Sequence, residues 1–407
     1  MPGVTDTKIQ IGVYTADAGT GNAVMGAVTG GNSDSQDPDR FFKEVIGEVN
    51  KKGVAGRQLE PVWHFVDYNQ YVNSSARQNE HQRMCSAWTE DNKVFSISGA
   101  GMMDDLIIDC AAKAKTTIVM SGYQPPISKQ RFDAIAPYWY SPNGMLTDHR
   151  ESSVTRFLHA NGFFSPGAKI GLVVEDTPYI RAGVNRGLKP TLASLGLKAE
   201  VEVVYPDVVE SPWSTYVLTL FEKGVTHVLM SATTGGSLPG LFMTRAANEQ
   251  GFKPQWGLGS DQTPDRLVNN PSSPEQLANV WAAGWMPAYD VGISAPAASP
   301  ADQRCRDIQA RVSYQSTASN TGNAHAFCEV IFFLQAALDQ ADEVSPQGMA
   351  EGAARLGASY ASTLTVDGKT TFGRSDHEGP SVARLLRYNA AQKRFAYTTA
   401  PQPLTPS

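Results

Sequence analysis

The four cysteines are the residues of this chain whose number and spacing say most about its chemistry. Cys85, Cys110, Cys305 and Cys328 form two local pairs in a chain of 407 residues. An even number of paired cysteines favours disulfide bonds, which persist in oxidising compartments because the cytosol keeps thiols reduced. We therefore expect the protein to work outside the cytoplasm.

Two pairs of adjacent acids are candidates for acid–base chemistry. Asp104 and Asp105 stand at a predicted helix start, where carboxylates cap a helix and complement its dipole. Glu175 and Asp176 end a predicted strand, where a hinge or rim position is as reasonable as contact with a ligand. Neither pair predicts a catalytic dyad.

The motifs of nucleotide, nucleophile and metal chemistry are absent or incomplete. Gly19-Thr-Gly21 resembles part of a dinucleotide loop, but Val24 stands where the third glycine belongs and Asp67 comes too late to bind a ribose. This segment is better interpreted as the wall of a ligand cleft or as a flexible loop. The chain has no GxxxxGK, GxSxG or HExxH motif, its seven histidines show no metal-ligand spacing, and His325 is expected to be structural. We therefore expect no enzyme activity, no cofactor and no metal site.

The composition narrows the possible partners. The net charge is −6, which argues against nucleic acid and against an anionic membrane surface. The longest apolar run, from Val330 to Leu338, is interrupted by Gln335 and predicts a core helix rather than a membrane span. Residues 1–4 lack the basic start and apolar stretch of a signal peptide, so we expect that an export signal has been removed.

Strand and helix patterns alternate along the chain and restart after residues 137–142. Alternating apolar residues predict a strand at 8–14, and further strand patterns occur at 59–67, 94–98, 116–120, 170–174, 227–230 and 255–258. Helical spacing predicts helices at 38–53, 74–88, 106–114 and 242–250, one that opens at Pro212, and a long last helix over 327–338. Such alternation predicts parallel sheets with right-handed crossovers, here two sheets in two lobes. Ligands bind outside the carboxyl ends of such strands, so we expect the site in a cleft between the lobes.

Several segments resemble one family when they are taken in their order along the chain. Thr5–Gly12 is similar to its opening strand, and Val49–Arg57 carries a similar asparagine, glycine and glycine-arginine turn. Gly171–Asp176 with Tyr179, Gly251-Phe252 with Asp261, and the closing hairpin expected at Phe372–Tyr388 continue the series. The chain thus resembles the type I periplasmic solute-binding proteins of ABC importers, in the branch that binds branched-chain amino acids.

The resemblance implies an α/β fold of two Rossmann-like lobes with parallel sheets, joined by a hinge that the chain crosses three times. The crossings are expected near Tyr140, Trp285 and Thr365. Lobe 1 then comprises residues 1–141 and 286–366, lobe 2 comprises 142–285 and 367–400, and residues 401–407 form a tail. Many members have a disulfide between the second and third helices, which implies a bond between Cys85 and Cys110. Cys305 and Cys328 are expected to form a second bond that is not general in the family; free buried thiols are the alternative for both pairs.

The resemblance also implies ligand contacts at the ends of strands. Amino-acid binders hold the ammonium with an acid, hold the carboxylate with hydroxyl and backbone N–H groups, and close the mouth with a tyrosine. These roles fall on Asp261 as the acid, Tyr179 as the tyrosine, and Ser121, Gly122, Tyr123, Thr234 and Gly235 as the hydroxyl and N–H contacts. The plainer alternatives are a surface acid in a turn and a tyrosine that is merely packed or exposed.

The third predicted strand departs from the family, because Gly99-Ala-Gly-Met-Met103 stands where a serine or threonine is usual. Gly101, Met102 and Met103 could offer backbone N–H groups and adaptable apolar surface. Tyr140, in the nearby aromatic segment, is a further candidate contact, with core or hinge packing as the alternative. The departure favours an amphipathic acid or an aromatic solute over leucine-like amino acids.

These features together predict the extracytoplasmic solute-binding component of an ABC importer. Its expected partners are a small solute and the permease subunits, with membrane contact only through a lipid anchor, and it is expected to be monomeric. A ligand-sensing receptor domain of the same fold is the first alternative, and an α/β enzyme is a less favoured one.

Overall fold

The computed structural model describes residues 1–16, 38–66, 74–100, 105–122, 127–206, 208, 211–231, 236–268, 273–292, 297–314 and 321–404. Internal contacts divide the chain into two units. Unit 1 comprises Met1–Pro125, Arg131–Gly144 and Pro296–Pro380, and unit 2 comprises Pro126–Gln130, Met145–Ala295 and Ser381–Ser407. Apart from the short segment at 126–130, the chain changes unit after Gly144, Ala295 and Pro380. From the sequence, the crossings between the lobes were expected near Tyr140, Trp285 and Thr365.

Unit 1 is built on a parallel sheet with the strand order β2-β1-β3-β4-β5. Its strands are β1 (Lys8–Ala16), β2 (Gln58–Val66), β3 (Ser96–Ala100), β4 (Thr117–Ser121) and β5 (Trp139–Tyr140). All five carboxyl ends therefore lie along one edge of the sheet. Four of these strands follow the predicted apolar runs, and β5 is an addition in the aromatic segment.

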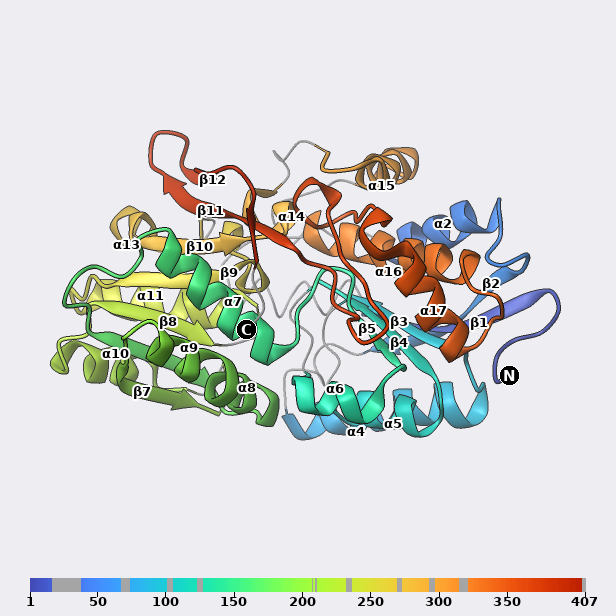
Figure 1. Ribbon diagram of the computed structural model, residues 1–407, viewed down its shortest axis with the longest axis horizontal. Helices are drawn as coiled ribbons and strands as arrows, with labels where there is room; N and C mark the ends of the chain where they lie inside the picture. The colour runs from blue at the N-terminus through green and yellow to red at the C-terminus, as the bar shows by residue number, and fades with distance from the viewer. Residues whose placement is uncertain are drawn as a thin grey trace. The chain divides into compact units, whose positions relative to one another are not determined.

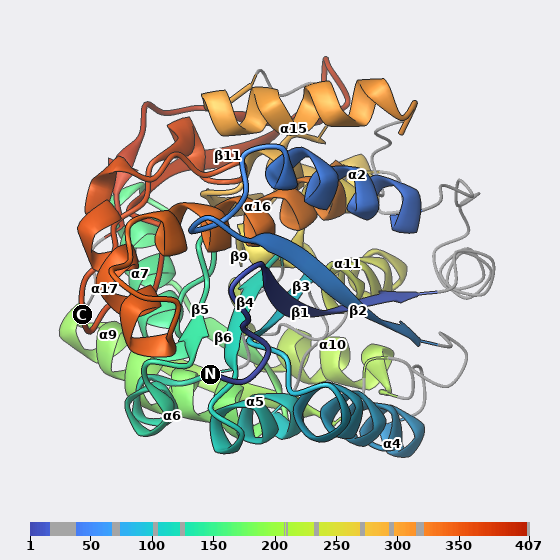
Figure 2. The same ribbon diagram turned by 90° about the vertical axis from the view of Figure 1, so that its right-hand side faces the viewer.

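Helices cover both faces of this sheet, as Figure 2 shows, with α2, α15 and α16 above it and α4 and α5 below. The upper layer contains α2 (Pro38–Asn50), α15 (Pro300–Arg311), α16 (Thr321–Asp339) and α17 (Pro346–Leu356), and the lower layer contains α4 (Ser74–Cys85) and α5 (Asp105–Lys113). A further helix, α6 (Lys129–Ile135), begins where the chain returns to unit 1. Strands with a helix layer on each side are buried on both faces, as the five buried residues of β4 show.

The core of unit 1 fills the space between β1 and the upper helices. Ile9, Ile11 and Val13 alternate along β1 and are fully buried, and they join Val330 and Ile331 of α16 in one hydrophobic cluster. Burying each of these side chains contributes roughly 1.5–3 kcal/mol. On the other face of β1, a Cβ on Gly12 would lie 2.8 Å from the Trp88 ring, so glycine there lets the indole pack directly on the strand.

Both predicted disulfides are present and both lie in unit 1. Cys85 at the end of α4 is bonded to Cys110 on α5, and Cys305 on α15 is bonded to Cys328 on α16. Each bond joins two helices of the same layer, with Cα–Cα distances of 6.0 Å and 5.9 Å. The cysteine pairing expected from the sequence is therefore confirmed.

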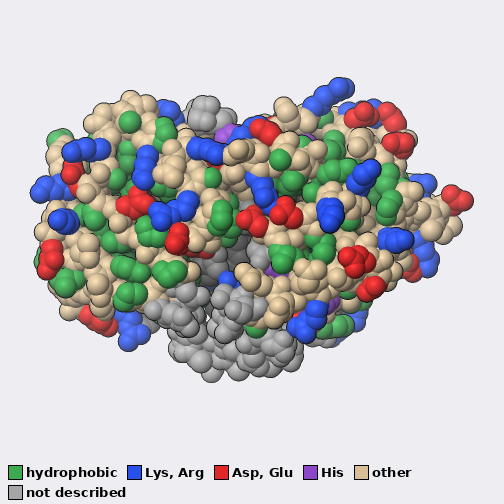
Figure 3. All heavy atoms as spheres, turned by 90° about the horizontal axis from the view of Figure 1, so that it is seen from below, with side chains coloured by type: hydrophobic (Ala, Val, Ile, Leu, Met, Phe, Trp, Pro, Cys, Tyr) green, Lys and Arg blue, Asp and Glu red, His purple; other side chains and the backbone are tan. Residues whose placement is uncertain are grey.

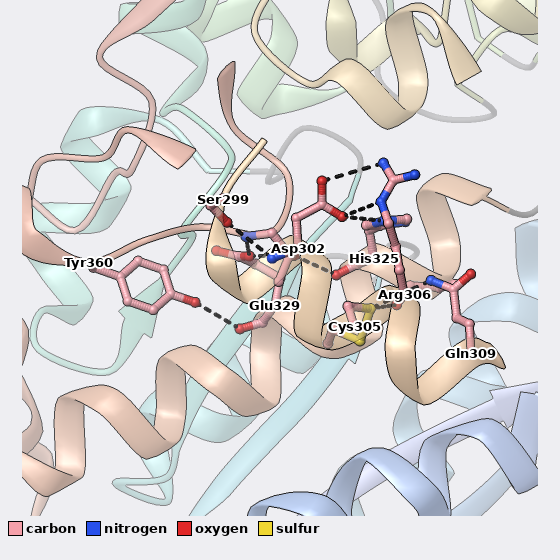
Figure 4. The surroundings of a disulfide bond; sticks show 11 residues. Ser299, Asp302, Cys305, Arg306, Gln309, His325, Glu329 and Tyr360 are labelled. Atoms are coloured by element: carbon pink, nitrogen blue, oxygen red, sulfur yellow. Dashed lines mark hydrogen bonds and ion pairs between the residues drawn. A yellow bond between two sulfur atoms is a disulfide. The ribbon is translucent and has the colours of Figure 1, made fainter. Parts of the chain in front are cut away.

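The second disulfide lies beside a buried ionic cluster, shown in Figure 4. His325 Nε2 lies 2.8 Å from Asp302 Oδ1, and Arg306 Nε donates to the same oxygen at 2.9 Å. Burial alone would raise the pKa of Asp302, but its hydrogen bonds to His325 and Arg306 lower it. His325 thus fixes α16 to α15, which is a structural role.

Unit 2 is built on a larger, mixed sheet with the order β12-β11-β10-β9-β8-β6-β7. Its parallel strands are β6 (Ile170–Glu175), β7 (Ala199–Tyr205), β8 (His227–Ser231), β9 (Gln255–Gly259) and β10 (Val280–Gly284). The hairpin of β11 (Val382–Asn389) and β12 (Arg394–Tyr397) adds antiparallel strands beside β10. The carboxyl ends of the parallel strands again share one edge.

Helices also flank the sheet of unit 2. Figure 1 shows α7 (Thr147–Ala160) running across the sheet with α8 (Pro178–Gly183) and α9 (Lys189–Ser194) beside it. The remaining helices are α10 (Trp213–Glu222), α11 (Leu238–Glu249), α12 (Asp265–Val268), α13 (Pro274–Ala278) and α14 (Pro287–Asp290). The two-sheet α/β architecture predicted from the alternating pattern is therefore confirmed.

Some local predictions differ from the structure. The closing hairpin expected at 372–388 is formed later, by β11 and β12, because 372–381 pairs only through isolated bridges. Residues 401–407 were expected to be a tail, but Gln402 and Pro403 form β13 and pair with β11. The helix expected at 74–88 continues after Cys85 as a π-helical segment to Asp91.

No helix among the described residues is long and apolar enough to cross a membrane. On the face drawn in Figure 3, Lys and Arg side chains alternate with Asp and Glu over the described residues. The face in this view therefore lacks, in its described part, a broad basic patch of the kind that binds nucleic acid.

Candidate functional site

The carboxyl edge of the unit 1 sheet carries two of the predicted ligand contacts within the described residues. Ser121 ends β4, and Gly122 follows it with a φ of 97°, which favours glycine. The predicted contacts Gly101, Met102, Met103 and Tyr123 lie outside the described residues. Their proposed contact with a solute stays a prediction.

Ser121 has an unusual environment for a hydroxyl group. Its side chain is 1% exposed, and its Oγ has no hydrogen-bond partner among the residues that the structure describes. Beside it, Asn143 Nδ2 donates to the Gly122 carbonyl at 3.1 Å, and the Gly122 N–H points back to Asn143 Oδ1 at 3.4 Å. A buried hydroxyl without a partner costs about 1–3 kcal/mol, so a bound molecule that bonds to it would gain this energy.

Tyr140 lies in the core of unit 1. Its side chain is fully buried, and its ring stacks on His377 at a centroid distance of 4.2 Å and lies 5.7 Å from Phe333. Its hydroxyl has no partner in the described part of the chain, and burial raises its pKa well above the ordinary value. Tyr140 is thus packed in the core, as the alternative interpretation of this residue expected. Its role as a ligand contact stays a prediction.

The carboxyl edge of the unit 2 sheet carries two further predicted contacts within the described residues, Tyr179 and Asp261. Tyr179 lies on α8 just after β6 and is half-buried. Thr234 and Gly235 lie outside the described residues. Asp261 follows β9 in a short turn, Ser260–Gln262, and is fully buried.

Asp261 is part of a buried ion pair inside unit 2. Arg150 Nε donates to Asp261 Oδ2 at 3.1 Å, and a second guanidinium nitrogen donates to Oδ1, also at 3.1 Å. The exposed fractions of the two side chains are 2% and 0%. Burial raises the pKa of Asp261, and the Arg150 cation opposes that shift. Asp261 is therefore not the surface acid that sequence reasoning offered as its alternative role.

The pair extends into a network at the ends of β8 and β9. Arg150 also donates to Glu151 Oε1 at 2.7 Å, and the hydroxyl of Ser231, the last residue of β8, donates to the same oxygen at 2.6 Å. Gln262 Nε2 donates to the Met230 carbonyl at 2.8 Å, and its Oε1 accepts the Gly259 N–H at 3.0 Å. One cation and two carboxylates are thus buried together and satisfy one another.

Sequence reasoning identified Asp261 but missed Arg150, Glu151 and Ser231. Arg150 and Glu151 lie on α7, where Asp148, Ser152, Ser153 and Thr155 are also buried. The apolar spacing of Val154, Phe157 and Leu158 marks only the end of this helix, so periodicity could not predict the part that carries Arg150 and Glu151. The available signal was an adjacent Arg-Glu pair on a segment between two predicted strands.

A second buried acid, Asp290, ends α14 close to the point where the chain leaves unit 2. Its Oδ2 accepts from the Tyr397 hydroxyl at 2.7 Å, the Ser260 hydroxyl at 3.0 Å and the Met286 N–H at 3.0 Å. Burial raises the pKa of Asp290 to about 7, with a further contribution from Asp265, and burial raises the pKa of Asp265 to about 6. The Asp290 carboxylate thus joins three segments of unit 2 through hydrogen bonds from uncharged donors.

The described residues contain no group of three or more His, Cys, Asp or Glu side chains that could hold a metal ion. The ionisable groups found at the strand ends are used for internal pairing. Chemically, this arrangement suits recognition of a molecule by positioned hydroxyl, amide and aromatic groups.

The comparisons with known proteins rest on structure, because no protein-family model and no curated protein matches the chain. A fatty acid ABC transporter substrate-binding protein from Thermomonospora curvata is similar, at 18% identity and a TM-score of 0.67, over 98% of this chain and 94% of that chain. A branched chain amino acid ABC transporter protein from Thermus thermophilus with bound valine matches at 14% identity and a TM-score of 0.67, over 98% and 97%.

A solute binding protein of an ABC transporter from Rhodopseudomonas palustris HaA2, in complex with p-hydroxybenzoic acid, matches at 14% identity and a TM-score of 0.67, over 98% of each chain. The solutes named for these three proteins differ in chemistry. Each of the three structures nevertheless matches this chain over nearly its whole length. The chain therefore has the two-unit α/β fold of ABC transporter substrate-binding proteins, as the resemblance in its sequence predicts.

Proposed function

We propose that this protein is the extracytoplasmic solute-binding component of an ABC importer. The observation that carries the proposal is the match of both units, over nearly the whole chain, to substrate-binding proteins of such importers. The protein captures a small amphipathic solute at the carboxyl ends of its strands, without chemical conversion, and delivers it to permease subunits. The two disulfides support a location outside the cytoplasm.

The proposed contacts are those that sequence reasoning placed at the strand ends. In unit 1, the Ser121 hydroxyl is buried without a described partner, so a solute that bonds to it relieves a cost of the free protein. In unit 2, Tyr179 lies at the start of α8, where a half-exposed ring can cover a bound solute. Closure of the two lobes around the solute stays a prediction.

A thermal-shift screen tests this function directly. The panel contains amino acids, aromatic acids, fatty acids and other small organic acids. A true ligand at 100 times its dissociation constant stabilises the protein by about 2.7 kcal/mol and raises the melting temperature. A broad panel in which every member leaves the melting temperature unchanged contradicts the proposal.

Two serine variants give the screen a matched control. Ser121→Ala removes a buried hydroxyl without a partner, so we expect unchanged or higher stability of the free protein but about tenfold weaker binding of the solute. Ser98, in the middle of β3, is also buried without a described partner, and Ser98→Ala should leave binding unchanged. Equal effects of the two substitutions on binding contradict the role of Ser121.

A further inference from the structure

We infer that the solute of this protein carries no cationic amino group, and that Arg150 is the residue that determines this. The inference rests on the proposed function and deepens it. It names the class of solute as organic acids or neutral amphipathic molecules rather than α-amino acids or amines. Arg150 acts as a positioning residue, because it controls what Asp261 can bind.

A solute with an ammonium group would need an acidic partner in the site. An ammonium ion taken out of water needs an anion or several free acceptors, since burying an unpaired charge costs several kcal/mol. Sequence reasoning offers Asp261 for this purpose. In the structure, each oxygen of its carboxylate accepts a hydrogen bond from Arg150 at 3.1 Å.

Further contacts hold Arg150 in its ion pair with Asp261. A guanidinium group stays charged at all ordinary pH values and binds a carboxylate in a two-pronged geometry. Arg150 is 2% exposed, and it also donates to Glu151 Oε1 at 2.7 Å and to the Met230 carbonyl at 3.3 Å. An incoming ammonium would have to displace a partner that is fixed by contacts to α7, β8 and the turn after β9.

The carboxylates of Glu151 and Asp176 are also paired within unit 2. Glu151 is 2% exposed and already accepts from Arg150 and Ser231. Asp176, after β6, is half-exposed and lies 3.0 Å from Arg181 Nε, so it is screened by solvent and paired. Both carboxylates therefore already have partners within unit 2. A solute without an ammonium group requires no carboxylate to bind it.

Matched solutes test the inference on the unmodified protein. Isothermal titration compares leucine with 4-methylpentanoate, 4-methylpentanol and isopentylamine, and phenylalanine with 3-phenylpropanoate, 3-phenylpropanol and 2-phenylethylamine. In at least one series, we expect the acid or the alcohol to bind about 100-fold more tightly than the compounds that carry an amino group. If an amino acid or amine binds within tenfold of its amino-free counterpart, the inference is overturned while the proposed function stands. If neither these solutes nor the broad panel above bind at all, the proposed function itself fails.

A variant then tests the part played by Arg150. Arg150→Met frees the carboxylate of Asp261, so we expect the affinity for the amino acid to rise at least tenfold relative to its amino-free counterpart. Arg245→Met is the control, because Arg245 pairs with Glu249 on the surface of α11, with 61% of its side chain exposed. An unchanged preference in a folded Arg150→Met variant overturns the role of Arg150. If that variant does not fold, the titrations on the unmodified protein still decide the class of solute.

Discussion

Asp261 and Asp290 are both fully buried aspartates of unit 2, but different groups stabilise them. Asp261 is held by the Arg150 cation, whereas Asp290 receives hydrogen bonds from the neutral donors Tyr397, Ser260 and Met286. A buried carboxylate without a cation retains its proton to higher pH. Asp290 should therefore make the stability of the protein depend on pH.

The expected direction follows from the raised pKa of Asp290, about 7 in the folded protein against an ordinary value of about 3.9. Below the ordinary value both states are protonated, and the contribution of Asp290 to stability is fully present. As the pH rises through about 7, the folded protein must also lose the proton, and that contribution is lost. We expect Asp290→Asn to gain stability relative to the unmodified protein between pH 5 and pH 8.

Urea unfolding at pH 5, 6.5 and 8 measures this difference. Asp176→Asn provides a control, because this carboxylate lies on the surface with 49% of its side chain exposed. A difference between Asp290→Asn and the unmodified protein that stays constant over this range contradicts the account.

Two glycines give a matched test of packing at the residue scale. A Cβ on Gly259 would lie 2.5 Å from Asp261 Oδ1 and 2.9 Å from the Trp285 ring, whereas a Cβ on Gly47, in the interior of α2, meets nothing within 4 Å. We expect Gly259→Ala to lower the free energy of unfolding by about 1–3 kcal/mol through overpacking. Gly47→Ala should raise it by about 0.5–1 kcal/mol, because alanine favours a helix. Equal effects of the two substitutions in chemical denaturation contradict this assignment.

The sequence identified some of these residues but not their partners. The order of motifs singled out Asp261, yet its partner Arg150 lies 111 positions earlier, in the polar first part of α7. Ser121 follows a clear strand signal, so its place at the strand end was predictable. That its hydroxyl lacks a described partner depends on tertiary packing, which local patterns do not encode.

At the scale of elements, the two disulfides each join two helices that pack on one face of the unit 1 sheet. They enclose 25 and 23 residues of sequence, and a loop of that length contributes about 3 kcal/mol in the chain-entropy model. We expect Cys85→Ala with Cys110→Ala, and Cys305→Ala with Cys328→Ala, each to lower the free energy of unfolding by about this amount.

The two bonds should differ in their response to a mild reductant. Cys85 is 7% exposed, whereas Cys305 and Cys328 are fully buried beneath the helices. Because exchange requires access of a thiolate to the sulfur, the Cys85–Cys110 bond should be reduced first. Alkylation followed by mass spectrometry reads the order of reduction. Four alkylated cysteines before any reductant is added contradict both bonds.

Elements with a strong apolar signal were predictable, and weaker ones were not. The strands β4, β6 and β8 carry nearly continuous apolar runs because helices cover both faces, and β1 carries alternating apolar residues. The strands β7 and β10 were missed, since β7 carries Glu200 and Glu202 and β10 consists largely of small residues. The shift of the hairpin to β11 and β12 reflects irregular pairing over residues 372–381, which its sequence did not reveal.

At the scale of the whole molecule, the order of motifs along the chain predicted the fold. The fold alone does not determine which solute is bound. Structures that match nearly the whole chain bear names or ligands as different as a fatty acid transporter, valine and p-hydroxybenzoic acid. Under the proposed function, solute selection would depend on a few side chains at the strand ends of each unit. In unit 2, we infer that the pairing of Arg150 with Asp261 limits what can bind.

Solute capture can be observed by native mass spectrometry of the protein with the solute that raises its melting temperature most. We expect a single adduct of one solute per chain, and the released solute should have an unchanged mass, because the proposed role is capture without chemical conversion. The disulfide-intact chain should carry this adduct at micromolar concentrations. The absence of an adduct with every solute of the panel, or release of a converted product, would contradict the account.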